Sequence, residues 1–201
     1  MHQNLLTGLR VLDLTHRLPG PLAGKILSDL GCEVIKIEDE QYKDPFLSGM
    51  FSHFDTSFKD WYQNINQNKK IERLSFNDPE IKNKIRSYLE TADGVLLSLS
   101  DKLKEKLGLS DRELSSQNLA VIELDSSSVL KKAMHDLNAL AESGFLSLHI
   151  KDETSPVVAP PFLPIAGISF GQHIATTLLA SIIKAQKSKV MIKEKCYLHD
   201  T

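Results

Sequence analysis

Hydrophobic and polar positions alternate with two different periods in residues 9–38, and the pattern predicts a strand, a helix and a second strand. Residues 11–14 and 34–37 are short apolar runs. Between them, a turn rich in Gly and Pro leads into apolar residues spaced i, i+3, i+4 and i+7, as on the buried face of a helix: Ala23, Ile26, Leu27 and Leu30. Gly31 follows at the position where glycine commonly ends a helix. Two parallel strands need such a crossover, so a βαβ unit opens the chain.

The same alternation continues to residue 198. Apolar runs predict strands over 70–76, 92–99, 119–124 and 189–198. Helical patterns cover 102–107, 110–115, 133–148 and 166–185, and a further helix begins with Asp78 as N-cap and Pro79 as first residue. For the helix over 133–148 we expect a buried stripe of Leu137, Leu140, Ala141, Gly144 and Leu148. The chain therefore predicts an α/β fold, an open, mostly parallel (Rossmann-like) sheet with helices on both faces.

Residues 39–60 interrupt this alternation with a polar stretch dotted with aromatic side chains. It has room for a short helix but shows no clear period. A connection of this length in a compact domain usually serves function or covers a neighbour.

Composition narrows the class of protein. The chain has 201 residues, 41% of them hydrophobic and 25% charged, with a net charge of −2, as in an ordinary globular domain without a marked affinity for nucleic acid or anionic membranes. Its apolar runs are shorter than a membrane span, and its first residues lack the features of a signal peptide. Cys32 and Cys196 lie far apart, and the histidines show no paired metal-ligand spacing, so we expect no metal site and a cytoplasmic location.

Three segments of the opening unit resemble one protein family. Residues 8–14, 20–24 and 29–38 are similar, in order and spacing, to the G-x-x-V-L-D-L-T, G-P-x-A-G and D-L-G-A-E-V-I-K-I-E motifs of the family III CoA-transferases (CaiB/BaiF type). This family also contains the α-methylacyl-CoA racemases. Further likenesses follow at 66–80, 92–110, 135–148 and 161–183. The resemblance reaches almost every part of the chain but covers only the N-terminal half of a typical member, which implies a single truncated family domain over 1–201 without the second, smaller domain.

Asp136 is the first candidate for catalysis. In the transferases the matching aspartate attacks the acyl-CoA thioester, giving an anhydride and then an aspartyl-CoA thioester. The residue falls near the start of a predicted helix, where the helix dipole favours a carboxylate. An aspartate in a first helical turn is also a common capping residue, so the sequence leaves both roles open.

His135 precedes Asp136 and matches the His-Asp pair of the racemase-type motif, in which the histidine is one of two bases flanking the acidic α-carbon. The second base of the racemases is an aspartate, and Gly167 stands at its place. Glycine cannot transfer a proton, so transferase chemistry is favoured over racemisation. The alternative for His135 is a partly exposed residue at a helix end.

The resemblance also implies CoA or acyl-CoA as substrate, with no other cofactor. CoA needs cations for its phosphates and a pocket for adenine. The matching positions hold His16, Arg17, Leu74 and Lys106, while Lys36 and Lys69 add positive charge. Two family features are replaced: the N-F-R-P-G motif by residues 98–102, and the glycine-rich loop before the His-Asp helix by the glycine-free 123–134.

Two functions remain open on these grounds. The first is a truncated acyl-CoA-handling enzyme that works through Asp136. The second is a catalytically inactive interaction or scaffold protein that retains the family fold. In either case we expect a homodimer or a partner chain to cover an apolar surface over 162–183.

Overall fold

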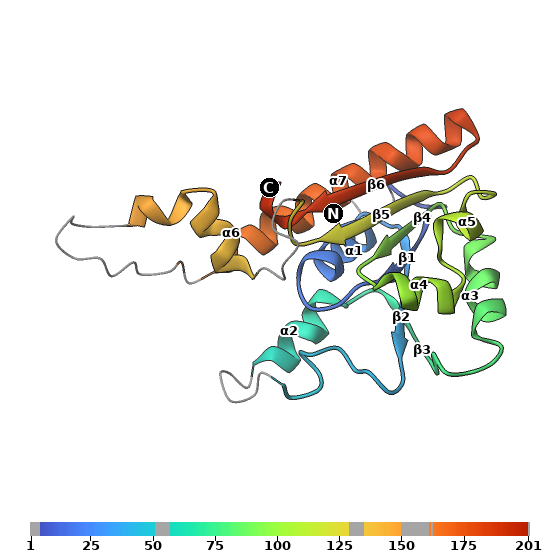
Figure 1. Cartoon of the computed structure of the whole chain (residues 1–201), viewed down its shortest axis with the longest axis horizontal. Coiled ribbons are helices and arrows are strands. Elements are labelled where there is room, and N and C mark those ends of the chain that lie inside the picture. The colour runs from blue at the N-terminus through green and yellow to red at the C-terminus, as the bar shows by residue number, and fades with distance from the viewer. Residues whose placement is uncertain (1–4, 51–56, 129–134, 150–160, 162, 201) are drawn as a thin grey trace.

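The computed structural model describes residues 5–50, 57–128, 135–149, 161 and 163–200. Its centre is a six-stranded sheet in the order β3-β2-β1-β4-β5-β6, with every neighbouring pair parallel (Figure 1). This is the strand order of a doubly wound dinucleotide-binding fold, and it confirms the predicted fold class. The strands are β1 (Arg10–Leu14), β2 (Glu33–Asp39), β3 (Lys70–Leu74), β4 (Gly94–Leu97), β5 (Ala120–Asp125) and β6 (Ile192–Tyr197).

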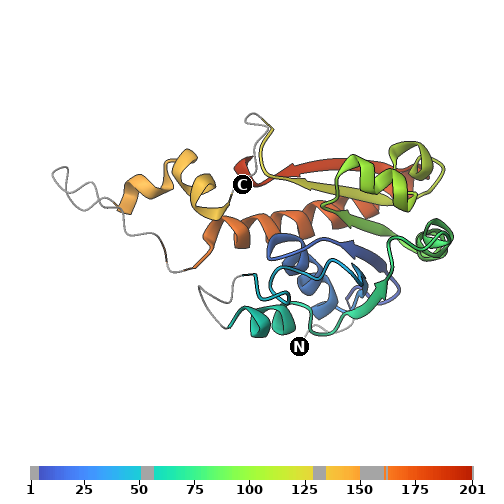
Figure 2. The same ribbon diagram turned by 60° about the horizontal axis from the view of Figure 1, so that its bottom comes forward.

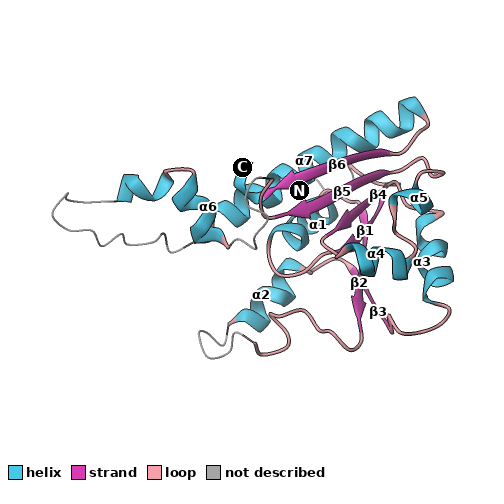
Figure 3. Ribbon diagram, in the orientation of Figure 1, coloured by secondary structure: helices cyan, strands magenta, loops and turns pink. Residues whose placement is uncertain are grey.

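Helices cover both faces of this sheet (Figure 3). On one face, α1 (Pro19–Asp29) and α7 (Ile165–Ser188) share a core with the sheet. On the other face the second core is completed by α3 (Ile81–Leu89), α4 (Asp101–Leu107) and α5 (Asp111–Leu114). The remaining elements lie near the carboxyl ends of the strands: α2 (Phe58–Ile65), α6 (Asp136–Glu142) and the short 3₁₀ helices η1 (Phe145–His149) and η2 (Leu198–Asp200).

Two glycines allow α7 to approach its neighbours closely. Figure 2 shows α7 running along β5 and β6 with α1 beside it. A Cβ atom on Gly94 of β4 would lie 2.9 Å from the Cδ1 atom of Leu178. A Cβ atom on Gly171 would lie 2.9 Å from the carbonyl oxygen of Pro19. The close packing of α7 on α1 and the sheet therefore depends on these two positions having no side chain.

Two local predictions were wrong. The helix expected to begin at Asp78 begins at Ile81, after a turn in which the Asp78 carboxylate accepts a hydrogen bond from the Glu80 N–H. The stripe expected over 133–148 is mostly exposed, since α6 and η1 form a hairpin that projects from the sheet (Figure 1). Only Leu140 of that stripe is buried, together with Ala139, while Leu148 is 78% exposed. Residues 133 and 134 of this segment lie outside the described residues.

The long helix α7 is amphipathic along most of its length. Its buried positions face α1 and the sheet, and its exposed positions include Gln172, His173 and Thr176. The predicted apolar surface over 162–183 is therefore reduced, among the described residues, to exposed side chains such as Leu163 and Ile183. By length and composition α7 could cross a membrane, but half of that stretch is buried inside the protein, as in the core helix of a globular domain.

Candidate active site

The strand order reverses between β1 and β4. In open parallel sheets, ligands bind outside the carboxyl ends of the strands at the point where the order reverses. Here β1 runs to Leu14 and is followed by Thr15, His16 and Arg17, while β4 is followed by the segment 98–100. The residues matched to CoA recognition after β1 therefore lie at the expected edge of the sheet.

Four residues form a buried group beneath this edge: Asp13, Thr15, Lys36 and Lys69. We call this group the buried ionic cluster. The Lys69 Nζ atom donates hydrogen bonds to Asp13 Oδ2 at 3.0 Å, to the Pro21 carbonyl oxygen at 2.7 Å and to Asn66 Oδ1 at 2.9 Å. The Lys36 Nζ atom donates to the Thr15 carbonyl oxygen at 2.6 Å. The side chains of Lys36, Lys69 and Asp13 have no exposed area.

The pKa values in this cluster follow from burial and charge. Burial alone would raise the pKa of Asp13, but the ammonium groups of Lys36 and Lys69 and a Thr15 hydrogen bond outweigh it and hold the pKa well below its ordinary value. Burial lowers the pKa of Lys69 to about 8, against the opposing effect of Asp13. Lys36 and Lys69 thus bind groups of this chain and present no ammonium to the surface. Their predicted part in CoA binding is, at most, to support the β1 loop from below.

Asp44 accepts a hydrogen bond from the backbone of the loop that follows β1. Arg17 has a φ of 65°, and its backbone N–H donates to Asp44 Oδ2 at 2.9 Å. The His16 Nδ1 atom lies 3.9 Å from the same oxygen. Burial and the Lys36 ammonium lower the pKa of His16 more than Asp44 raises it, so neutral imidazole is favoured. The Arg17 side chain is exposed at this edge, at the position that suits an anion.

Asp136 is the first residue of α6 and contacts the beginning of α7. Its Oδ1 atom accepts a hydrogen bond of 2.6 Å from the Gly167 N–H. Burial raises the pKa of the Asp136 carboxyl group, and the backbone hydrogen bonds from Gly167 and Ala166 counteract this only partly. The carboxylate is therefore held in a partly dehydrated position, where it is more basic than a free aspartate.

Gly167 brings Asp136 close to the loop after β1. A Cβ atom on Gly167 would lie 3.0 Å from Leu18 Cδ2 and 3.5 Å from Asp136 Oδ1. Leu18 directly follows His16 and Arg17 in the chain. Asp136 therefore lies near Leu18, the residue that follows Arg17 in the chain. The His135 side chain is exposed, and its backbone N–H donates to Asn138 Oδ1 at 3.0 Å.

Leu74 and Lys106 form a separate group beside β3. Leu74 ends β3 and is half-buried, while Lys106 is exposed near the end of α4. The Lys106 Nζ atom donates a hydrogen bond to Asn77 Oδ1, which ties α4 to the segment after β3. In the sheet β2 lies between β3 and β1, so a ligand that contacts both this group and the loop after β1 must reach across β2.

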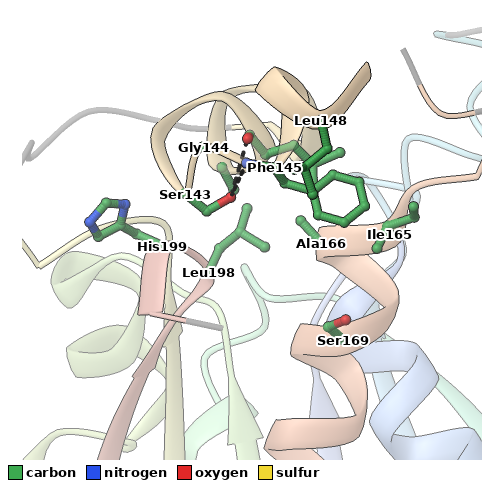
Figure 4. Close-up of a pocket in the computed structure, with 11 residues that line it drawn as sticks. Ser143, Gly144, Phe145, Leu148, Ile165, Ala166, Ser169, Leu198 and His199 are labelled. Carbon is green, nitrogen blue, oxygen red and sulfur yellow. Dashed lines mark hydrogen bonds between the residues drawn. The ribbon is translucent and has the colours of Figure 1, made fainter. Parts of the chain in front are cut away.

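Two grooves border the beginning of α7. The first, which we call the hairpin groove, measures about 510 Å³ and lies between α6, η1, η2 and α7 (Figure 4). Its apolar lining includes Phe145, Leu148, Ile165 and Leu198, with His199 at one side. The second, which we call the Trp61 groove, measures about 370 Å³ and is lined by Leu18, Leu22, Lys25, Trp61, Asn64, Ile65 and Ile168.

Sequence reasoning missed Asp44, Leu18 and Trp61. Asp44 lies in the irregular segment 39–60, where no period marks one residue above another. Leu18 is part of the LPGPLAG turn, where Gly and Pro predict the backbone but nothing distinguishes one leucine from another. The one available signal for Trp61 was a large aromatic side chain on the polar stretch before β3, and in the structure it is 38% exposed.

Comparisons with known proteins agree with this architecture. The family model of CoA-transferase family III matches residues 6–191. A probable fatty acyl-CoA transferase of Mycobacterium tuberculosis is 28% identical over 198 residues, 92% of this chain and 48% of its own length. The succinate–glutarate CoA-transferase of Agrobacterium fabrum is 26% identical over 196 residues, 91% of this chain and 48% of its own length. The chain thus spans about half the length of these curated relatives.

Solved structures show the same relationship. The crystal structure of the M. tuberculosis protein matches with a TM-score of 0.77 and 27% identity, over 97% of this chain and 53% of that one. A CaiB/BaiF family protein from Brucella suis has the same fold, with a TM-score of 0.83 and 20% identity over 98% of this chain and 54% of that one.

Proposed function

Because this chain belongs to CoA-transferase family III, we propose that it binds CoA or an acyl-CoA thioester at the carboxyl edge of its sheet and that Asp136 is the nucleophile. The observation that carries this proposal is the position of the Asp136 carboxylate, held by the Gly167 N–H next to the loop after β1. The N–H groups that bond to this carboxylate belong to the first turn of α7, so Asp136 also caps that helix.

The proposed reaction begins with attack of an Asp136 carboxylate oxygen on the thioester carbonyl carbon. The C–S bond breaks, CoA leaves as a thiolate and a mixed anhydride forms on Asp136. The thiolate then attacks the Asp136 carbonyl carbon, releases the acyl group as a carboxylate and leaves an aspartyl-CoA thioester. Only the ionised carboxylate can attack. As the pH is lowered, the rate should therefore begin to fall at a pH above the ordinary pKa of an aspartate.

For CoA itself we propose two contact regions. Arg17, with His16 beside it, would hold the diphosphate at the end of β1, and Lys106 with Leu74 would contact the adenosine end. Both cationic side chains are exposed, and guanidinium and ammonium groups form charge-assisted hydrogen bonds to phosphate. Lys36 and Lys69 would act only by supporting the loop, because their ammonium groups are buried.

Calorimetric titration with CoA and acetyl-CoA tests the binding half of this proposal. Arg17→Ala and Lys106→Ala should each weaken CoA binding several-fold. Lys102→Ala on α4 and Arg86→Ala on α3 are matched controls, since both side chains are exposed, and they should leave the affinity unchanged. Equal losses in all four variants would indicate only non-specific attraction between CoA and positive charge.

Intact-mass measurement after incubation with acyl-CoA tests the chemical half. The wild type should gain the mass of an acyl group or of CoA, and peptide mapping should place it on Asp136. Asp136→Asn keeps an oxygen that can accept the Gly167 N–H and should fold normally but form no adduct. An adduct of equal yield on Asp136→Asn would refute the role of Asp136.

Racemisation receives less support. Gly167 offers only its backbone N–H, and that group is bonded to Asp136. The His135 side chain is exposed.

The second candidate function is an inactive interaction protein. It is favoured by the large apolar side chains exposed around α6 and the start of α7: Leu137, Leu148 and Leu163. Absence of binding heat at millimolar CoA, together with absence of any adduct, would decide for this function.

A further inference from the structure

The Trp61 groove lies between α1, α2 and α7 and is almost entirely apolar. Leu18 and Leu22 come from α1 and the residue before it, Trp61 and Ile65 from α2, and Ile168 from α7. Its volume of about 370 Å³ falls in the range of small-molecule sites. Trp61 is 38% exposed, so the groove opens to the surface along its ring.

One residue that lines this groove, Leu18, lies close to the Asp136 carboxylate. A Cβ atom on Gly167 would contact both Asp136 Oδ1 and Leu18 Cδ2, so these two groups lie on the same side of α7. Leu18 lines the Trp61 groove, and Ile168, the next residue after Gly167, lines it too. Asp136 lines neither groove; the hairpin groove is larger but carries polar side chains in its lining, including Ser143, Ser169 and His199.

The residues that line the groove offer no unpaired cation that could bind the distal carboxylate of a dicarboxylic acyl group. Lys25 is its one ionisable lining residue, and the Lys25 Nζ atom donates to both carboxylate oxygens of Asp29 at 2.9 and 2.8 Å. Asn64 supplies the other polar side chain. A dicarboxylic acyl group would have to place its distal carboxylate against Leu, Ile and Trp side chains, which costs several-fold in affinity or more.

We propose that the Trp61 groove holds the acyl chain of the thioester attacked by Asp136, and that it selects apolar chains of medium length over dicarboxylic ones. This inference rests on the proposed function, because it takes the Asp136 carboxylate as the point of attack. Leu18, Trp61 and Ile168 are then the residues that determine acyl specificity.

Unreactive CoA thioethers separate acyl recognition from chemistry. The wild-type chain is titrated with CoA, S-ethyl-CoA, S-hexyl-CoA and S-(4-carboxybutyl)-CoA, the last matched to S-hexyl-CoA in length. Each added methylene should tighten binding about two- to fourfold, as burial of a CH₂ group predicts. S-hexyl-CoA should bind about tenfold or more tightly than its carboxylated counterpart.

Variants locate the site. Trp61→Ala should remove most of the gain with chain length, and Ile168→Lys should reverse the preference towards S-(4-carboxybutyl)-CoA. Leu148→Ala in the hairpin groove is the control, since Leu148 is 78% exposed and its loss should neither unfold the chain nor change chain selectivity. An unchanged circular dichroism spectrum shows that each variant is folded, so that differences in affinity can be compared.

Two results would overturn the inference alone. One is tight CoA binding without any dependence on chain length. The other is a chain-length effect lost in Leu148→Ala but kept in Trp61→Ala and Ile168→Lys. Failure of CoA and of every thioether to bind would instead refute the proposed function, and the inference would fall with it.

Discussion

The buried ionic cluster at the ends of β1 and β2 and the hairpin of α6 and η1 border the same edge of the sheet, but different forces hold them in place. In the cluster, Lys69 directs hydrogen bonds to three partners and has no exposed side-chain area. In the hairpin, Leu140 is buried but Leu148 is 78% exposed. The Asp136–Gly167 hydrogen bond is the polar contact that joins the hairpin to α7 at the proposed nucleophile.

From this contrast we infer that the two regions have different roles in the site. A cluster whose every charge is paired keeps the loop with His16 and Arg17 in one conformation, as recognition of a fixed cofactor-like group requires. Among its described residues the hairpin buries Ala139 and Leu140, so less apolar burial holds it in place than holds the strands. We therefore expect substitutions in the cluster to affect global stability and substitutions in the hairpin to affect chemistry.

The largest effect is expected for Lys69→Met. Removing one partner leaves the Asp13 carboxylate buried with Lys36 as its remaining cation, and breaking a buried pair typically costs about 3–5 kcal/mol. Urea unfolding followed by circular dichroism measures the loss. Lys70→Met is the matched control, because its exposed ion pair with Glu72 should leave the unfolding midpoint unchanged. Similar midpoints for both variants would show that the cluster does not hold the sheet edge.

A second effect follows from the pKa of Lys69. The folded chain loses this proton at about pH 8, whereas the unfolded chain keeps it to about pH 10.5. Between these values the unfolded state binds more protons, so the unfolding free energy of the wild type should rise with pH, by up to about 1 kcal/mol per pH unit. The difference between wild type and Lys69→Met isolates this contribution from other titrating groups. A difference that stays flat from pH 8 to 10 would contradict a lowered pKa.

Alanine substitutions at Gly167 and Gly171 test how closely α7 packs against its neighbours. Gly171→Ala should cost about 1–3 kcal/mol, because its Cβ atom would meet the Pro19 carbonyl oxygen at 2.9 Å and force α1 and α7 apart. Both substitutions gain up to about 1 kcal/mol in helix propensity, but Gly167→Ala should cost less, since its Cβ atom meets only side-chain atoms, at 3.0 Å and 3.5 Å. Thermal unfolding of the two variants gives the comparison, and a larger loss for Gly167→Ala would reverse our view of this helix crossing.

The smallest effect is expected for Glu142→Gln on α6. The Glu142 carboxylate lies 3.1 Å from His199 Nδ1, but both side chains are about a third exposed. Such a pair contributes about 0.5 kcal/mol or less. The same unfolding measurements should show almost no change, and a loss comparable to that of Lys69→Met would mean that the hairpin is held as firmly as the cluster.

Local pattern was sufficient for most of the fold. The strands, the helices α1 and α7 and the helical turns around Gly108 were predictable because their apolar periodicity matches the face they bury. The same reasoning failed for residues 137–148, where a helical stripe is present but little of the protein lies opposite it. Periodicity shows which side of a helix is apolar, and whether that side is covered depends on the path of the chain.

For this protein, the sequence alone determined the parallel sheet, its family and the identity of Asp136 as the candidate nucleophile. Only the tertiary structure decided that Lys36 and Lys69 are buried partners of Asp13, that Asp44 holds the loop after β1, and that the Asp136 carboxylate accepts a hydrogen bond from the first turn of α7. The reason is physical: residue type and spacing specify which charges are present, whereas contacts between residues far apart in the chain specify whether each charge meets a partner or solvent.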